Sequence, residues 1–266
     1  MTAGVARTPG GWSALPALLL AGALLGGWEG YADLGGVQEQ VLPAPHAVAA
    51  ALWNNASLVF HNFTVTAEEV VLGLALALGA GLALAVALHL SPPLRRAVYP
   101  LAVGSQAVPV PVIGVLLVFW WGFGIFPKLV VIALICFFPV LVTTVDGLAA
   151  VDPDQPKLLR TLDASRWQAF RFAELPAALP AALSGARIAL AVGVIGAFIA
   201  ETSTPTTAAY AGLGREIITD AGGFQTARAY AATAVLIAFA VACFYALALA
   251  QRRLAPWAVP SRGDTR

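Results

Sequence analysis

The feature that most constrains this chain is a set of long runs without charge. Residues 70–88 contain only apolar residues and glycine, and residues 129–145 are also free of charged side chains. A helix that crosses the hydrocarbon core of a bilayer needs about 20 predominantly apolar residues. Across all 266 residues, 59% are hydrophobic and 11% are charged, with a mean hydropathy of +0.81. The sequence therefore predicts an all-α, polytopic membrane protein and not a soluble domain.

The apolar runs predict six transmembrane helices separated by polar connections. They cover residues 12–28, 70–88, 97–121, 129–145, 177–200 and 229–250. We divide the chain into a head at 1–11, a transmembrane domain at 12–254 and a tail at 255–266. The first run follows Arg7, as in a signal peptide, but it lacks a small-x-small cleavage site, so we expect it to be retained.

Two connections carry predictions of their own. Residues 29–66 form an acidic, polar connection in which prolines indicate an extended segment before a short helix. Residues 202–228 form a glycine-containing connection with a short surface helix expected around 215–219. Glu201, at the end of the fifth run, is interpreted as a boundary charge. Both cysteines lie in apolar runs, where a thiol is usually a packing residue.

Prolines interrupt the third predicted span. Pro109-Val110-Pro111 lies in its middle, and Gln106 precedes it by about one turn. Proline removes backbone hydrogen bonds that lipid cannot replace, so neighbouring helices or water must satisfy the freed carbonyls. One interpretation is a kinked helix that lines a pathway, with Gln106, Pro109 and Pro111 as its wall. The other is a packing kink, since prolines are common in membrane helices.

The polar interval between the fourth and fifth runs is predicted to form two short helices meeting at a bend. Asp152 before Pro153 is typical of a helix start. Ser165 followed by Gln168 is a capping-box pattern for a second helix, which we expect to end before Pro176. Asp163 lies at the bend, where aspartate tolerates a left-handed conformation better than most residues. An apolar stripe marks the first helix, formed by Leu158, Leu159 and Leu162.

This interval resembles the cytoplasmic coupling loop of bacterial ABC importer permeases, here residues 146–176. The resemblance rests on the pattern Leu-x-x-x-Asp-Ala-Ser followed by a Leu-Pro pair at 175–176. The family's usual Glu-Ala-Ala is replaced by Lys157-Leu158-Leu159, and its central glycine by Asp163. The resemblance extends from about residue 42 to the sixth span and is closest to the nitrate, sulfonate and taurine branch. Within that branch the chain is most similar to permeases for the hydroxymethylpyrimidine precursor of thiamine. The motifs that resemble the branch are Leu42-Pro43-Ala44-Pro45, Pro109-Val110-Pro111, Trp121-Gly122-Phe123-Gly124 and Phe137-Phe138-Pro139. Those that resemble the thiamine-precursor permeases are Pro127-Lys128, Phe137-Phe138-Pro139-Val140, Thr144-Val145-Asp146-Gly147-Leu148 and Glu174-Leu175-Pro176-Ala177-Ala178-Leu179-Pro180.

Basic residues are distributed unevenly between the two sides of the six predicted spans. If the 146–176 loop is cytoplasmic, eleven Lys and Arg residues fall on its side and three on the other. Cytoplasmic loops are enriched in Lys and Arg, so both termini are predicted to be cytoplasmic, in a bacterial plasma (inner) membrane. No Gly-x-x-x-x-Gly-Lys-Ser/Thr pattern occurs in the sequence, so ATP and Mg²⁺ are expected on a partner and no cofactor on this chain.

The resemblance implies a type I ABC importer permease fold and a defined set of partners. They are two cytoplasmic ATPase subunits, an external substrate-binding protein and a second copy of this chain; no nucleic acid partner is expected. The residues implied in ATPase contact are Leu158, Leu159, Leu162, Asp163, Ala164 and Trp167. A surface helix pair anchored at the lipid headgroups by Trp167 is the alternative for this loop.

The expected function is a non-catalytic permease subunit for a small organic solute, best matched by a hydroxymethylpyrimidine-type thiamine precursor. Riboflavin, sulfonate or taurine, and nitrate are alternatives within the same class. An ion-coupled secondary transporter is the alternative from another class. That class usually places an ionisable residue near the middle of a span, and the six runs contain none at their centres.

Overall fold

The computed structural model describes residues 15–203 and 211–258, and all regular structure in these ranges is helical. The all-α prediction is therefore confirmed. Two short non-α turns accompany the α-helices: a π-helical turn at Phe170–Glu174 and a 3₁₀ turn at Pro256–Ala258. The α-helices are α1 (Leu15–Leu34), α2 (Pro45–Asn54), α3 (Ala56–Leu90), α4 (Pro92–Ser105), α5 (Val110–Trp121), α6 (Ile125–Ala149), α7 (Asp154–Thr161), α8 (Arg166–Ala169), α9 (Leu175–Thr202), α10 (Leu213–Gly222) and α11 (Thr226–Leu254).

Four of these helical segments are long and apolar enough to cross a membrane. They are α3, α6, the continuous segment Arg166–Thr202, and α11. The pair α4 and α5 adds a fifth if it is counted as one span, and the two helices are bent by 94°. The bend lies at Pro109, so the predicted proline break is confirmed. The first predicted span corresponds to α1, and its residues 12–14 lie outside the described part of the chain.

The connection before the second span is mostly helical, which corrects its interpretation as a polar linker. The short helix predicted after the prolines is α2, which has Pro45 in its first turn. However, α3 then begins at Ala56, well before the apolar run starts at Val70. The polar side chains of Asn62 and Thr66 are buried and hydrogen-bonded, and these tertiary contacts extend the helix beyond its apolar section.

The described residues form two compact units. The smaller combines residues up to 59 with 217–233, and the larger combines 60–216 with 234 onward. In the smaller unit, the indole Nε1–H of Trp28 donates to the carbonyl of Pro43 at 3.1 Å. Asp220 and Arg228 form an ion pair in the same unit. The first contact ties α1 to the loop that follows it, and the ion pair joins the end of α10 to the start of α11.

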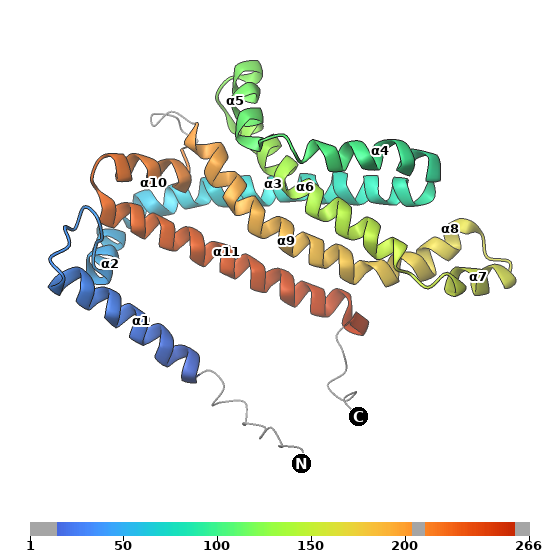
Figure 1. The fold of residues 1–266 in the computed structure, drawn as a ribbon, viewed down its shortest axis with the longest axis horizontal. Coiled ribbons are helices and arrows are strands. Elements are labelled where there is room, and N and C mark those ends of the chain that lie inside the picture. The colour runs from blue at the N-terminus through green and yellow to red at the C-terminus, as the bar shows by residue number, and fades with distance from the viewer. Residues whose placement is uncertain (1–14, 204–210, 259–266) are drawn as a thin grey trace, which may run out of the picture. The chain divides into compact units, whose positions relative to one another are not determined.

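The larger unit is built on the packing of α6 against α9, which run side by side (Figure 1). Glycine permits their close approach at two positions. A Cβ on Gly185 would lie 1.8 Å from Thr143 Oγ1, and one on Gly193 would lie 2.7 Å from Cys136 Sγ. Membrane helices gain little from the hydrophobic effect and depend on such close backbone contact.

Three apolar clusters join the other helices to this pair. One contains Leu148 of α6, Phe170 and Ala178 of α9, with α3 packed against it. The second joins α3 to α6 through Leu88 and Leu141. The third lies at the other end of α6 and α9 and includes Leu117 of α5. The clusters connect α3, α5, α6 and α9 in one bundle that carries α7 and α8 at one end (Figure 1).

Candidate functional site

The bend between α7 and α8 has the geometry that the sequence predicts. Asp163 adopts a positive φ of 57°, the left-handed conformation that a glycine would otherwise supply. Ser165 caps α8: its side chain accepts from the Gln168 amide, while the Gln168 side chain accepts from the Ser165 amide at 2.7 Å. The N-cap of α7 is Pro153 and not Asp152 as predicted, but the Asp152 carboxylate accepts from the Asp154 amide, the first of the helix, at 2.9 Å.

The predicted end of the second helix before Pro176 is wrong. The chain passes from α8 through the π-helical turn Phe170–Glu174 directly into α9, which carries Pro176 in its first turn. A proline cannot donate to the carbonyl four residues earlier and its ring clashes there. A π turn widens the helix by one residue and accommodates this without ending it. The loop is thus continuous with a membrane helix.

Buried contacts fasten the loop to the ends of three membrane helices. Phe170 is only 2% exposed and packs against residues of α3, α6 and α9. His89 Nε2 lies 2.6 Å from Glu174 Oε2, which joins the end of α3 to the π turn. The Arg166 guanidinium donates to the carbonyl of Leu90 at 2.8 Å, satisfying a terminal carbonyl of α3. Any displacement of the loop is therefore transmitted to these helices.

The outer side of the same loop exposes apolar side chains. Leu158 is 64% exposed, Leu162 is 72% exposed and Trp167 is 57% exposed. Asp163 is also exposed, whereas Leu159 and Ala164 are partly buried. The Trp167 ring stacks on the buried Phe170 ring with centroids 5.4 Å apart, so Phe170 fixes the orientation of the exposed indole. We call Leu158, Leu162, Asp163 and Trp167 the coupling corner.

The three predicted pathway residues lie around the break between α4 and α5, and none of them is buried. Gln106 lines a cavity of about 320 Å³ together with α6 and α9 side chains, among them Phe138 and Val192. Pro111 lines a separate cavity of about 130 Å³ at the end of α5. The structure brings Gln106 and Pro111 to different cavities, while Pro109 lies at the bend itself.

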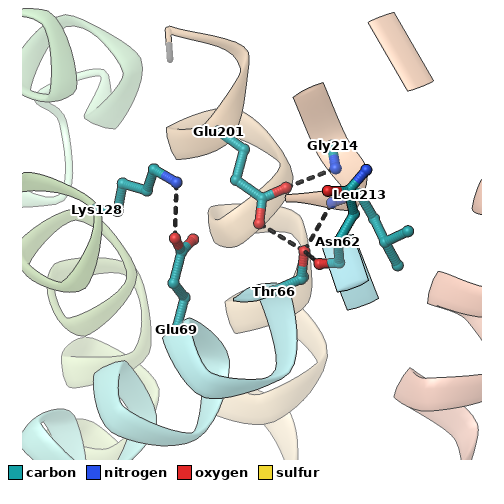
Figure 2. A network of polar contacts seen from close by, with 7 residues as sticks. All are labelled: Asn62, Thr66, Glu69, Lys128, Glu201, Leu213 and Gly214. Carbon is teal, nitrogen blue, oxygen red and sulfur yellow. Dashed lines mark hydrogen bonds and ion pairs between the residues drawn. The ribbon is translucent and has the colours of Figure 1, made fainter. Parts of the chain in front are cut away.

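A buried polar network lies at the opposite end of the bundle (Figure 2). Lys128 of α6 donates to Glu69 Oε1 of α3 at 2.7 Å, and both side chains are almost completely buried. Thr66 of α3 donates to Glu201 Oε1 of α9 at 2.6 Å. On the same helix, Asn62 donates to Glu216 of α10 at 2.6 Å. Four helices are therefore joined by polar contacts in an otherwise apolar region.

Glu201 also holds the start of α10. The Gly214 amide donates to Glu201 Oε2 at 2.5 Å, and the Leu213 amide donates to Thr66 Oγ1 at 2.9 Å (Figure 2). Both amides belong to the first turn of a helix, where backbone donors lack helical partners. A Cβ on Gly212 would lie 2.0 Å from Glu201 Oε1, so only glycine permits this approach. The prediction of a short helix in this connection is confirmed, with bounds Leu213–Gly222.

Helix geometry places the network and the loop at opposite sides of the membrane. Residue 69 is 21 positions from the end of α3, and residue 128 is 21 positions from the end of α6. At 1.5 Å per residue each distance is about 32 Å, close to the thickness of the hydrocarbon core of about 30 Å. Both of these helix ends lie at the loop. The network therefore occupies the mouth remote from the coupling corner.

Comparison with known proteins decides the family. A model of the binding-protein-dependent transport system inner membrane component matches residues 75–259. The chain is 34% identical over 233 residues to a probable ABC transporter permease of Haemophilus influenzae, covering 88% of this chain and 94% of the relative. The chain belongs to this permease family. The resemblance seen in the sequence is therefore confirmed, and this permease is the membrane component of an ABC transporter, with the ATPase a separate partner.

Relatives with named substrates show the breadth of the family. The permease is 35% identical over 175 residues to the formylaminopyrimidine transport permease ThiX of Halalkalibacterium halodurans, covering 65% of this chain and 70% of ThiX. It is 32% identical over 248 residues to the riboflavin transport permease RibX of Chloroflexus aurantiacus, covering 92% and 91%. A crystal structure of an amino acid ABC transporter matches with a TM-score of 0.62 at 18% identity, covering 77% of this permease and 97% of that chain. At that identity the match shows the fold alone.

The network is the feature that sequence interpretation missed. Glu201 is predicted to be a boundary charge, but its side chain is 0% exposed, and the side chain of Lys128, which lies just outside the predicted fourth span, is 4% exposed. Glu69 directly precedes the predicted second span, and its side chain is fully buried in α3. A signal existed: Asn62, Thr66 and Glu69 recur at intervals of four and three, which places them on one helix face. The predicted span begins only at residue 70, so these three residues were not assigned to its helix.

One group of potential metal ligands occurs among the described residues, in the smaller unit. Atoms of Glu29, Asp33 and His46 lie within 4.8 Å of one another. Glu29 accepts from the His46 backbone amide at 3.2 Å and lies 2.5 Å from His46 Nδ1. These contacts are those of a cap at the start of α2, which accounts for the group. The hydrogen bond that His46 donates to Glu29, and then the negative charge of Glu29, raise the pKa of His46 above the usual value.

Proposed function

We propose that this permease forms the translocation pathway for import of a small, uncharged aromatic heterocycle of the thiamine-precursor type. The observation that carries the substrate class is the cavity beside Gln106. Apart from Ser105 and Gln106 its lining is apolar, and it contains Phe138 and no charged residue. Binding pockets for small molecules are mostly apolar with a few polar groups that set orientation, so this lining favours a neutral ring over an anion.

The relatives support the same class. ThiX carries a formylaminopyrimidine and RibX carries riboflavin, according to their names, and both compounds contain nitrogen heterocycles. Riboflavin is accordingly the second candidate substrate. Taurine and aliphatic sulfonates are transported by other relatives, TauC of Escherichia coli and SsuC of Bacillus subtilis. Those anions, and nitrate as well, require a compensating positive charge that the Gln106 cavity does not offer.

In the proposed assembly, two copies of the chain form the pathway and two ATPase subunits bind the coupling corners. Both termini lie on the ATPase side, because the basic residues are concentrated there. A substrate-binding protein delivers the solute at the opposite mouth. ATP-driven closure of the ATPases displaces the coupling corner, and the contacts of Phe170, Arg166 and Glu174 carry this displacement into α3, α6 and α9. The helix bundle is then the element with two arrangements.

Uptake by the reconstituted transporter tests the substrate class. The permease, its ATPase and its binding protein are placed in liposomes, and ATP-dependent uptake of labelled hydroxymethylpyrimidine, riboflavin and taurine is compared. Pyrimidine uptake should exceed that of taurine, and Gln106→Leu should reduce it, while Gln155→Leu on exposed α7 serves as the matched control. Taurine uptake as the strongest activity would overturn the neutral-ring assignment.

Co-purification tests the coupling corner separately. ATPase recovery with a tagged permease is measured for the wild type, for Asp163→Arg and for Glu68→Arg. Asp163 and Glu68 are both exposed, but Glu68 lies on α3 far from the loop. Asp163→Arg should release the ATPase and Glu68→Arg should retain it. Equal retention by both variants would place ATPase contact elsewhere.

A further inference from the structure

We propose that the buried network of Glu69, Lys128 and Glu201 is a proton-binding site at the membrane mouth remote from the ATPases. The bound proton resides on Glu69 and is shared with Glu201. This inference goes beyond the import function, which requires no proton. It stands on the hydrogen-bond partners of each oxygen and on the balance of buried charge.

The donors around the two carboxyl groups are unequally distributed. Both oxygens of Glu201 accept hydrogen bonds, from the Thr66 hydroxyl and from the Gly214 amide. Glu69 Oε1 accepts from Lys128, but Glu69 Oε2 is buried and no donor among the described residues reaches it. Hydrogen bonds from donors stabilise the ionised form of a carboxyl group. Glu201 is therefore suited to remain a carboxylate, and Glu69 to hold the proton.

The two carboxyl groups belong to the same buried network. Figure 2 shows the second Glu69 oxygen, which no donor among the described residues reaches, on the side that faces Glu201. Two carboxylates cannot hydrogen-bond each other, since both are acceptors. A proton on Glu69 Oε2 supplies the missing donor. It also explains why a buried acceptor atom otherwise lacks a partner.

Among the described residues, the charges around the site sum to one negative charge in excess. The carboxyl groups are Glu69 on α3, Glu201 on α9 and Glu216 on α10, and the cations are Lys128 on α6 and Arg215 on α10. Glu216 accepts from Asn62, and Arg215 donates to the carbonyl of Thr202. The lining that α5 contributes beside Lys128 carries no charged residue. An uncompensated charge inside a membrane protein is costly, and one bound proton neutralises the excess.

The site lies at the remote mouth, so opening of the transporter at this mouth would bring water to it. Lys128 also lines the cavity of about 130 Å³ between α5, α6 and α9, so separation of these helices would bring water to the pair. Water stabilises both carboxylates and releases the proton. If one proton leaves on opening, the ratio of open to closed states rises up to tenfold for each unit of pH on that side.

Infrared spectroscopy of the full-length permease in lipid nanodiscs tests the bound proton. A protonated carboxyl group has a C=O stretching band distinct from that of a carboxylate. At neutral pH the wild type should show this band, and Glu69→Gln should lose it. Glu68→Gln is the matched control, since Glu68 is the exposed neighbour on α3, and it should retain the band. Circular dichroism verifies that each variant is folded.

A second variant separates a shared proton from an isolated neutral acid. In Glu201→Gln, Glu69 faces only Lys128 and should ionise, so the band should disappear in this variant as well. Its persistence in Glu201→Gln would show that Glu69 is neutral without its partner and would overturn the shared site. Absence of the band in the wild type, or its presence in Glu69→Gln, would overturn the proposal without reference to any transport assay.

Discussion

Removal of the Lys128 ammonium should destabilise the permease far more than removal of an exposed lysine. The Lys128 and Glu69 side chains are 4% and 0% exposed, and their charged atoms are 2.7 Å apart. The ammonium compensates the one negative charge that Glu69 and Glu201 share, and a buried charge left without compensation typically costs about 3–5 kcal/mol. We therefore expect Lys128→Met to lower the free energy of unfolding by about this amount. The change removes the cation and keeps a side chain of similar length.

Lys157→Met is the matched control for this experiment. Lys157 also forms an ion pair, at 2.9 Å with Asp154, but the two side chains are 69% and 80% exposed. Exposed pairs contribute about 0–1 kcal/mol, so this variant should resemble the wild type. Unfolding is measured in mixed micelles with an increasing fraction of denaturing detergent, followed by circular dichroism.

A double variant tests whether charge is the cause. Glu201→Gln added to Lys128→Met removes the carboxylate that is left without a cation. Contacting residues usually show interaction energies of about 0.5–3 kcal/mol, so we expect the second change to recover stability within that range. If Lys128→Met costs no more than Lys157→Met, the network does not stabilise the bundle and this reasoning is refuted.

Two further predictions concern the coupling corner and the cap of α2. Asp163→Val should weaken ATPase co-purification, because a β-branched residue at φ 57° costs about 1–2 kcal/mol. Asp163→Gly should retain the ATPase, and Ala164→Val should weaken co-purification less than Asp163→Val does. Glu29 raises the pKa of His46 in the folded protein. The ion pair therefore stabilises the fold fully when the pH is below the ordinary histidine pKa of about 6.5. This stabilisation is lost as the pH rises through the pKa that His46 has in the folded protein. The melting temperature of His46→Gln should fall below that of the wild type only in acid, while the exposed control His61→Gln should show no such pH-dependent difference.

Local signals in the sequence predicted the bend between α7 and α8 well. The bend at Asp163 and the capping box at Ser165 depend on residues within three positions of each other, and both appear in the structure. The proline break of the third span is equally local, because proline acts on its own helix. Tertiary context determined what happens at Pro176, where packing of Phe170 against three helices keeps the chain helical through a π turn.

The buried network could not be predicted from run lengths, because its partners come from distant parts of the chain. Glu69 and Lys128 are 59 positions apart, and Thr66 and Glu201 are 135 apart. Each residue alone resembles a charge at a membrane boundary. Only the fold brings them together, where mutual compensation makes their burial tolerable.

The same three helices are fastened at both of their ends, and this bears on how the proposed transport cycle is controlled. At the loop, Phe170 and the His89–Glu174 contact join α3 and α9 to the coupling corner. At the other end, Glu69 and Glu201 join α3 to α6 and α9 through Lys128 and Thr66. Packed helices move as stiff bodies, so a displacement at the loop must either break the remote contacts or carry all three helices together. In the first case Lys128→Met should raise ATP hydrolysis in the absence of substrate, because it removes resistance to opening; in the second it should not.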